Sequence, residues 1–534
     1  MLKRAAIAAI ALACATGALA DAETECGSKS GPPDQVIVAC SQFIKPDVRA
    51  VRAYLNRGLA YQAQGELDRA IAEYDKAIAL DPKYVAAYYN RGLAYQIKGD
   101  LDRAIAEYDK AIGLDPKYVA AYYNRGVAYQ DKGELDRAIA DCDKAIALDP
   151  KLAVAYGGRG NAYQAKGEQD RAIADYDKAI DLDPKFAVAY HNRGLAYQAK
   201  GELDRAITDY DKAIALDPKY VAAYHNRGVA YQGKGELDRA ITDFDKAIDL
   251  DPKFAVAYGG RGNAYEAKGD LDRAITDCDK AIALDPKDAA AYGGRGNAYQ
   301  TKGELDRAIT DYDKAIALDP KLAAAYHNRG LAYKSKGELD RAIADFDKAI
   351  ALDPKLAAAY HKRGYALYSK GELDRAIADY GKALELEPKN GGAWRMLGVA
   401  RYAAGDFKGA AADLLRSMEI DADAYAMLFR FLARSRAGES AEAGLEADAR
   451  WLKSKEWPFA VTELYLGRRS TAATLAAAAT PDQKCEAQFY IGQWHVVKGN
   501  RGDAETALQA AVDTCPKTFV EYRAAVVELK RLQP

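Results

Sequence analysis

The sequence lacks an excess of charge of either sign. Its 534 residues include 76 basic and 78 acidic side chains, which leaves a net charge of −2. Domains that bind nucleic acids through phosphates usually present a surplus of Lys and Arg, so this balance argues against a nucleic-acid-binding protein. The sequence also has no acidic tail.

Long apolar runs and catalytic motifs are missing as well. Beyond the first twenty residues, no stretch approaches the roughly 20 consecutive apolar residues of a transmembrane helix. We find no nucleophile motif, no phosphate-binding loop and no metal-ligand spacing among the five histidines. We therefore expect a chain that is not an enzyme and that uses no metal or cofactor.

Residues 1–20 have the three parts of a secretory signal peptide. Lys3 and Arg4 precede an apolar stretch, and Ala18-Leu19-Ala20 fits a cleavage site. These features predict export to the periplasm. A lipid anchor on Cys14 is the alternative, but the three residues before it fit a lipobox poorly, so we expect no anchor.

A period of 34 residues dominates the rest of the chain. The dipeptide Asp-Pro recurs at this step, and Glu387-Pro388 continues the series. A fixed period of this length indicates a solenoid of stacked repeats. The Asp-Pro pairs begin at Asp81, Asp115, Asp149, Asp183, Asp217, Asp251, Asp285, Asp319 and Asp353.

Each unit predicts two helices, here named A and B. Small and aromatic residues recur at helical spacing on one face of each helix, and Gly99 separates the two helices in the second repeat. Gly92 of helix A and Ala104 of helix B predict a close approach, so a larger side chain at Gly92 would cost about 1–3 kcal/mol. Asp115 is expected to cap the next helix A, with Pro116 in its first turn.

The order of Tyr, Leu, Gly, Tyr, Ala, Tyr, Ala and Pro over 34 residues resembles the tetratricopeptide repeat (TPR). The resemblance implies an all-α fold, an α/α superhelical TPR solenoid of about 11–12 helix-hairpin repeats with helical caps. Residues 21–47 would form an N-terminal tail and capping helix, 48–387 ten near-identical repeats, and 388–421 a divergent repeat. The helical region 422–534 would contain one further TPR-like repeat, 485–518, and a capping helix.

One departure from the TPR pattern recurs in every copy. Arg91, Arg125 and Arg159 stand where the family has leucine before the glycine. We expect the arginine stem to pack between helices while its head pairs with an acid on a neighbouring helix B. A ligand-binding arginine is the alternative.

The cysteines after the signal peptide fall into two classes. Cys485 opens helix A of the last repeat and Cys515 closes its helix B, so these antiparallel ends predict a disulfide. Cys26 and Cys40 are the second predicted pair. The other two occupy core positions four repeats apart and are expected as buried thiols: Cys142 and Cys278.

Because the repeats are nearly copies, the few positions that vary are candidates for a binding site. They lie on helix A, one, two and five residues after its first repeated Tyr. The family resemblance implies that helices A line a concave groove that binds proteins or peptides. The candidate groove residues are Tyr89, Asn90, Leu93, Tyr123, Asn124, Asn161, His191, Asn192, His225, Asn226, Asn263, Asn297, His327, Asn328 and His361.

Three repeats carry Gly-Gly at two of these positions: Gly157-Gly158, Gly259-Gly260 and Gly293-Gly294. Each glycine inside a helix costs about 1 kcal/mol relative to alanine. Two interpretations remain open. The glycines either allow close approach of a bound segment or reflect drift that was spread by duplication.

Residues 457–530 resemble the carboxy-terminal part of NlpI-type periplasmic TPR proteins. The matching stretches include Glu463–Gly467, Phe489–Gly492 and Phe519–Arg523. This resemblance implies an adaptor that recruits a PDZ-containing processing protease and cell-wall hydrolases.

The leading hypothesis is a non-catalytic scaffold or adaptor in the bacterial cell envelope. One alternative is a structural TPR subunit of an envelope or polysaccharide-export assembly. Another is an enzyme with its site in residues 422–534, where the residues to test are Glu463, Glu486, His495 and Glu521.

Overall fold

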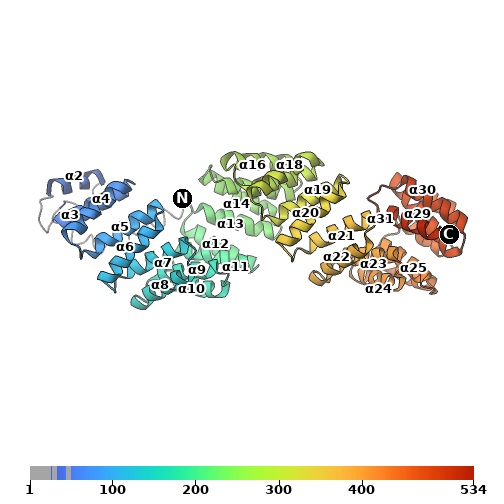
Figure 1. Ribbon diagram of the computed structural model, residues 1–534, viewed down its shortest axis with the longest axis horizontal. Coiled ribbons are helices and arrows are strands. Elements are labelled where there is room, and N and C mark those ends of the chain that lie inside the picture. Colours follow the sequence, from blue (N-terminus) through green and yellow to red (C-terminus); the bar gives the residue numbers. More distant parts are fainter. Residues whose placement is uncertain (1–25, 27–32, 44–49, 534) are drawn as a thin grey trace. The chain divides into compact units, whose positions relative to one another are not determined.

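The computed structural model describes Cys26, residues 33–43 and residues 50–533. The predicted signal peptide at 1–20, including Cys14, lies outside these described residues. Within them every regular element is a helix and none is a strand (Figure 1). The predicted all-α class with consecutive helix pairs is therefore confirmed. No described helix is long and apolar enough to cross a membrane.

The chain divides into two compact units, residues 1–252 and 253–534. In the first unit, α2 (Pro33–Phe43) packs on the first helix A, and A and B helices then alternate. Its A helices are α3 (Ala50–Ala63), α5 (Val85–Lys98), α7 (Val119–Asp131), α9 (Ala153–Ala165), α11 (Ala187–Ala199) and α13 (Val221–Gly233). Its B helices are α4 (Leu67–Leu80), α6 (Leu101–Leu114), α8 (Leu135–Leu148), α10 (Gln169–Leu182), α12 (Leu203–Leu216) and α14 (Leu237–Leu250).

The second unit continues the alternation through five more pairs. Its A helices are α15 (Ala255–Ala267), α17 (Ala289–Thr301), α19 (Ala323–Ser335), α21 (Ala357–Lys370) and α23 (Gly391–Ala404). Its B helices are α16 (Leu271–Leu284), α18 (Leu305–Leu318), α20 (Leu339–Leu352), α22 (Leu373–Leu386) and α24 (Phe407–Ile420).

In most pairs a glycine of helix A lies against an aromatic ring of helix B, and in the others it lies against a cysteine or leucine. A Cβ built on Gly92 would stand only 2.8 Å from Cε1 of Tyr108, which is closer than real Cβ contacts. The ring is fully buried, and its hydroxyl donates a hydrogen bond of 2.7 Å to Gln96. Gly99 then ends helix A at a φ of 85°, a left-handed conformation that a side chain would strain. The predicted close approach at Gly92 is confirmed.

The expected cap at Asp115 is wrong. Asp115 follows the end of α6, and its carboxylate accepts a hydrogen bond of 2.9 Å from the backbone N–H of Lys117. The N-cap of α7 is Tyr118, whose backbone N–H donates to the Asp115 carbonyl at 3.0 Å. The Asp-Pro dipeptide therefore forms the turn between repeats, and the next helix begins later than predicted.

After α24 the regular alternation ends. The remaining elements are α25 (Ala424–Arg436), α26 (Glu442–Asp448), the 3₁₀ helix η2 (Ala449–Trp451), α27 (Phe459–Tyr465), α28 (Thr471–Ala477), α29 (Pro481–Lys498), α30 (Arg501–Thr514) and α31 (Val520–Leu532). Helices α29 and α30 form another A–B pair, and α31 packs on it. The predicted disulfide joins Cys485 to Cys515, with a Cα–Cα distance of 5.0 Å.

The last helix also reaches back to the regular repeats. Helix α31 contacts α21 and α23, both A helices (Figure 1). The Arg523 guanidinium donates to the Ser369 carbonyl at 3.1 Å, and Tyr368 donates to the Val520 carbonyl at 3.2 Å. The chain's end is thus held by residues about 150 positions earlier.

The other cysteines lie in the core. Cys142 and Cys278 are buried thiols, as predicted, and burial raises the pKa of each to about 12. Cys26 and Cys40 share a small apolar cluster with Ala53, and the contact with Cys26 raises the pKa of the Cys40 thiol. Their predicted disulfide remains a prediction.

Candidate functional site

Within each compact unit, the variable positions of successive helices A lie next to one another. We call the surface that they form the A face; in α5 it comprises Tyr89, Asn90 and Leu93. An Asn amide on one helix A donates to a side chain of the preceding helix A. The four described bonds run from Asn124 to Tyr89, Asn192 to Asn161 and Asn226 to His191, each at 2.8 Å, and from Asn328 to Asn297 at 2.9 Å.

These amide bonds give the predicted groove residues a second role. They connect neighbouring repeats and satisfy polar groups that the packing partly removes from water. Comparison of the repeats indicated that these positions vary, but it did not show that they bond to one another. The bonded partners stand 31 or 35 residues apart, and the sequence contains no sign of that offset.

Burial separates the predicted groove residues into groups. Six are buried and offer a ligand little surface: Tyr89, Asn90, Leu93, Tyr123, Asn124 and His191. Eight are half-buried: Asn161, Asn192, His225, Asn226, Asn297, His327, Asn328 and His361. Asn263 is exposed. The surface open to a partner therefore lies mainly from α9 onward.

The second glycine of a Gly-Gly pair leaves room for the neighbouring repeat. A Cβ on Gly158 would lie 3.0 Å from the ring of Tyr123, and one on Gly294 would lie 2.6 Å from Oδ1 of Asn263. Both neighbours belong to the preceding helix A. Packing explains these two glycines without a ligand.

The first glycine of the pair is different in the second unit. A Cβ on Gly259 or on Gly293 meets no described atom within 4 Å. Among the described residues no contact accounts for these glycines, although each lowers helix stability by about 1 kcal/mol. They form two open notches in the A face.

Burial lowers the pKa of the A-face histidines. In His191, Nε2 lies 2.8 Å from the Asn226 amide nitrogen and Nδ1 lies 3.1 Å from the Asn192 oxygen, which places the proton on Nδ1. Burial lowers the pKa of His225 and of His361 to about 4. In the described part of the chain, no three His, Cys, Asp or Glu side chains are placed to hold a metal ion.

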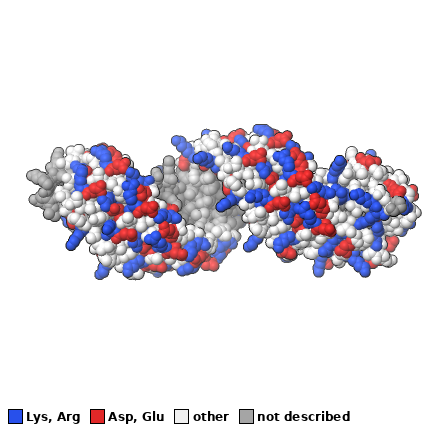
Figure 2. All heavy atoms as spheres, viewed as in Figure 1, with Lys and Arg blue, Asp and Glu red and all other residues white. Residues whose placement is uncertain are grey.

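The recurring arginine pairs with acids on two B helices. Arg193 donates to both carboxylate oxygens of Asp209 in its own repeat, at 2.8 and 2.7 Å, and also to Asp177 in the preceding repeat. Asp209 is only 4% exposed. The prediction of a packed, paired arginine is confirmed. On the face shown in Figure 2, acidic and basic residues are likewise interspersed, with no large area of one sign.

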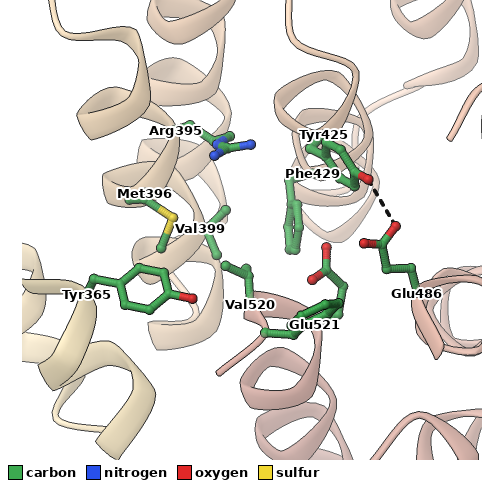
Figure 3. Close-up of a pocket in the computed structure, with 10 residues that line it drawn as sticks. Tyr365, Arg395, Met396, Val399, Tyr425, Phe429, Glu486, Val520 and Glu521 are labelled. Carbon is green, nitrogen blue, oxygen red and sulfur yellow. Dashed lines mark hydrogen bonds between the residues drawn. The ribbon is translucent and has the colours of Figure 1, made fainter. Parts of the chain in front are cut away.

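A pocket of about 220 Å³ opens where α31 meets the A face of the second unit (Figure 3). Tyr365, Arg395, Met396 and Val399 line one side. They occupy the same variable positions, one, two or five residues after the aromatic that opens helix A. The predicted residues ended at His361, although the same numbering of positions in residues 388–421 would have found three of these four.

The other side of the pocket comes from three later helices. Tyr425 and Phe429 of α25, Glu486 of α29, and Val520 and Glu521 at the start of α31 complete the lining, together with the preceding Phe519. In Figure 3 the two carboxylates lie on the same side, near the two aromatic rings, while Arg395 lies across the cavity.

The two glutamates differ in their environment. Glu486 accepts hydrogen bonds from the Tyr425 hydroxyl at 3.0 Å and from the Trp457 indole at 2.7 Å. Glu521 is 6% exposed and accepts from the Tyr490 hydroxyl at 3.2 Å. Burial, reinforced by the charge of Glu486, raises the pKa of Glu521 to about 7.

The structure does not bring together the residues of the enzyme alternative. Glu486 and Glu521 line the pocket, but Glu463 pairs with Arg469 at 2.7 Å, and His495 is not part of the lining. The lining of the pocket includes no Ser, Thr, Cys, Lys or His side chain. Its groups suit binding by charge and apolar contact.

Models of known families match most of the regular repeats. A TPR repeat model matches residues 58–99, 95–133, 160–201, 199–235, 296–337, 330–371 and 364–405. Further tetratricopeptide repeat models match residues 119–152, 225–289 and 278–310. The matches end before residues 457–530, so the NlpI-type resemblance is not confirmed.

Several solved structures are similar to parts of this chain, either over a short share of its length or at low sequence identity. A TPR protein from Parabacteroides merdae is 24% identical over 46% of this chain and 98% of its own, with a TM-score of 0.40. MamA is 38% identical over 30% of this chain and 95% of its own, with a TM-score of 0.28. Yeast Tom70 is 18% identical over 77% of this chain and 98% of its own, with a TM-score of 0.38.

A search of curated proteins found no match. The 34-residue period, the alternating A and B helices and the matching repeat models nevertheless agree with one another. The chain belongs to the tetratricopeptide-repeat family.

Proposed function

We propose that this protein is a non-catalytic scaffold of the bacterial cell envelope that binds proteins or peptides along its A face. Tetratricopeptide repeats generally present their surfaces to polypeptides rather than to small substrates. The leader-like residues 1–20 support a periplasmic location. The resemblance of residues 457–530 to NlpI-type proteins supports a processing protease or a cell-wall hydrolase as the recruited partner.

One observation carries the proposal: the chain's own C-terminal helix lies against the A face. The hydroxyl of Tyr365, an A-face residue, donates to the backbone carbonyl of Thr518, and Arg523 of α31 donates to the Ser369 carbonyl. The A-helix side chains Tyr365 and Tyr368 thus bind backbone carbonyls of a later segment, and Arg523 of that segment binds a backbone carbonyl of helix A in return. A partner polypeptide can be held through the same kinds of contact on the unoccupied A helices.

The two open notches provide the test. In the double variant Gly259→Glu, Gly293→Glu, charged side chains would project from the A face where a Cβ meets no described atom. The full-length protein, immobilised and exposed to envelope extract, should capture its partners. The variant should capture at least tenfold less of them.

A matched control uses a glycine on helix B of the same unit. Gly381 lies in α22, and a Cβ there also meets no described atom within 4 Å. Gly381→Glu adds one negative charge of the same kind outside the A face, against two in the double variant, and should leave capture unchanged. Equal capture by both variants would contradict binding along the A face, and capture of export-complex subunits alone would favour the assembly alternative.

A further inference from the structure

From the pocket beside α31 we infer a binding site for a cationic side chain, a lysine or arginine of a bound polypeptide, held between Glu486 and Glu521. This inference rests on the proposed scaffold function and specifies a chemical class of ligand for one end of the A face. Its support comes from the charges around the cavity, the character of its walls and its position.

The cavity has more negative than positive charge. Glu486 and Glu521 lie on one side, and Arg395 lies across from them (Figure 3). Arg395 pairs with Asp423 at 3.0 Å and its charge also favours the ionised form of Glu521, so the single cation of the lining is divided between at least two carboxylates. The described hydrogen bonds to those glutamates come from neutral hydroxyl and indole groups. Two carboxylates in a partly desolvated cavity favour a cation over any neutral ligand.

The walls fit a cation on an apolar stem. Met396, Val399 and Val520 provide aliphatic contact, and Tyr425 and Phe429 place aromatic rings near the carboxylates (Figure 3). Lysine and arginine have this composition, because a flexible hydrocarbon stem carries a charged head. Aromatic faces stabilise such a head further.

The position of the pocket favours a polypeptide as the source of the cation. Four lining residues are A-face residues, so a segment bound along the A face would pass over the opening. The cavity volume of about 220 Å³ accommodates a single long side chain better than a folded element. Free alkylamines share the same head chemistry and must be distinguished by experiment.

The test is calorimetric titration of the full-length protein with three probes. Acetyl-Gly-Lys-Gly-amide carries the cation, its norleucine analogue keeps the stem without the charge, and pentylamine is a free amine of similar length. We expect the lysine peptide to bind at least tenfold more tightly than the norleucine peptide. Tighter binding of the lysine peptide than of pentylamine supports a polypeptide side chain, whereas the reverse order overturns that assignment.

Two variants connect the binding to the carboxylates. Glu521→Gln and Glu486→Gln keep the size of the side chain and one acceptor oxygen but remove the charge, and each should weaken binding of the lysine peptide at least tenfold. Glu419→Gln, at an exposed position of α24 where Glu419 pairs with Arg416 at 2.8 Å, should have no effect. Unchanged affinity in both pocket variants, with melting curves that show folded protein, overturns the site.

A pH series gives an independent readout. The titratable and charged groups that face Glu521 from the packed helices are Tyr365, Tyr368, Arg395, Tyr425, Glu486 and Tyr490. Since the pKa of Glu521 is raised to about 7, affinity should increase about tenfold from pH 6 to pH 8 as this carboxyl ionises. Glu521→Gln should remove that increase. An equal increase in the variant would overturn the assignment to Glu521.

The outcomes separate this site from the general function. If envelope proteins are captured through the A face but the lysine peptide does not bind, the pocket inference fails and the scaffold function stands. If no protein is captured, the scaffold function fails whatever the titration shows.

Discussion

The regular repeats and the C-terminal region are built from the same kind of helix but are stabilised differently. In the first unit, apolar clusters are small; one extends from Val51 to Ala94 and another from Tyr89 to Ala162. In the C-terminal region, a single cluster joins residues from Ile343 to Ala525, with fully buried aromatic residues and a disulfide.

The comparison shows where stability is local and where it is shared. A repeat that contacts only its neighbours gains stability in increments, so damage to it should spread only a short distance. In the large C-terminal cluster, a change at one position affects helices far apart in the sequence. The following predictions test this difference, beginning with the largest expected effect.

Arg193→Leu should destabilise its repeat by about 3–5 kcal/mol, because Asp209 would remain buried without its charged partner. Hydrogen exchange measured by mass spectrometry should show faster exchange in α10 to α12 and unchanged exchange in α29 to α31. The double variant Arg193→Leu, Asp209→Leu should recover most of the loss. Faster exchange throughout the C-terminal helices would contradict local stabilisation.

Glu521→Gln should stabilise the C-terminal region in a pH-dependent manner. The folded-state pKa is raised from 4.5 to about 7, so the cost of ionising the buried carboxyl is absent below pH 4.5 and complete above pH 7. The variant's advantage in unfolding free energy should therefore grow between these values to about 3 kcal/mol. Denaturant melts at pH 5 and pH 8 measure it, and a constant difference would show that Glu521 does not titrate as described.

Gly194→Ala should cost about 2 kcal/mol, because the new Cβ would stand 2.7 Å from Cε1 of the buried Tyr210 ring. Hydrogen exchange in α11 and α12 reports the loss. Adding Tyr210→Leu should reduce the penalty of the alanine, since the ring that it strikes is then absent. Additive effects of the two changes would argue against the contact.

Gly293→Ala should have the smallest effect and the opposite sign. With no described atom within 4 Å, the added methyl group should raise helix stability by about 1 kcal/mol. Thermal melting of the full-length protein, monitored by circular dichroism, gives the shift. A decrease in stability would mean that the notch is filled within the fold.

The sequence predicted the parts of the fold that depend on local spacing. The 34-residue period, the A and B helices, the close approach of the two helices at Gly92 and the Cys485–Cys515 bond all follow from residues within one repeat, although the residue that Gly92 meets is Tyr108. Residues 442–477 form short helices without a repeat pattern, and their arrangement could not be derived. The return of α31 to α21 depends on contacts between residues about 150 positions apart, which no local pattern reveals.

The candidate site was predicted only in part for the same reason. Comparison of the repeats with one another found the A-face positions, because the few residues that differ between nearly identical repeats can be seen in a single sequence. It could not distinguish residues such as Tyr89, which the neighbouring repeat buries, from residues such as His327, which stay partly open. The pocket was missed because Arg395 belongs to the last regular repeat and Glu521 to α31, and the two come together only when the chain folds.

The anchoring of α31 has a consequence for the number of partners that a chain can bind and for the way in which such a chain can lengthen. Helix α31 is anchored to α21 and α23, while the copies before α21 make no described hydrogen bond to it. Whole repeats can therefore be gained or lost upstream in steps of 34 residues without rebuilding the terminal anchor. The number of A helices available to a partner would then change with each step, whereas every chain would keep one pocket at the same end.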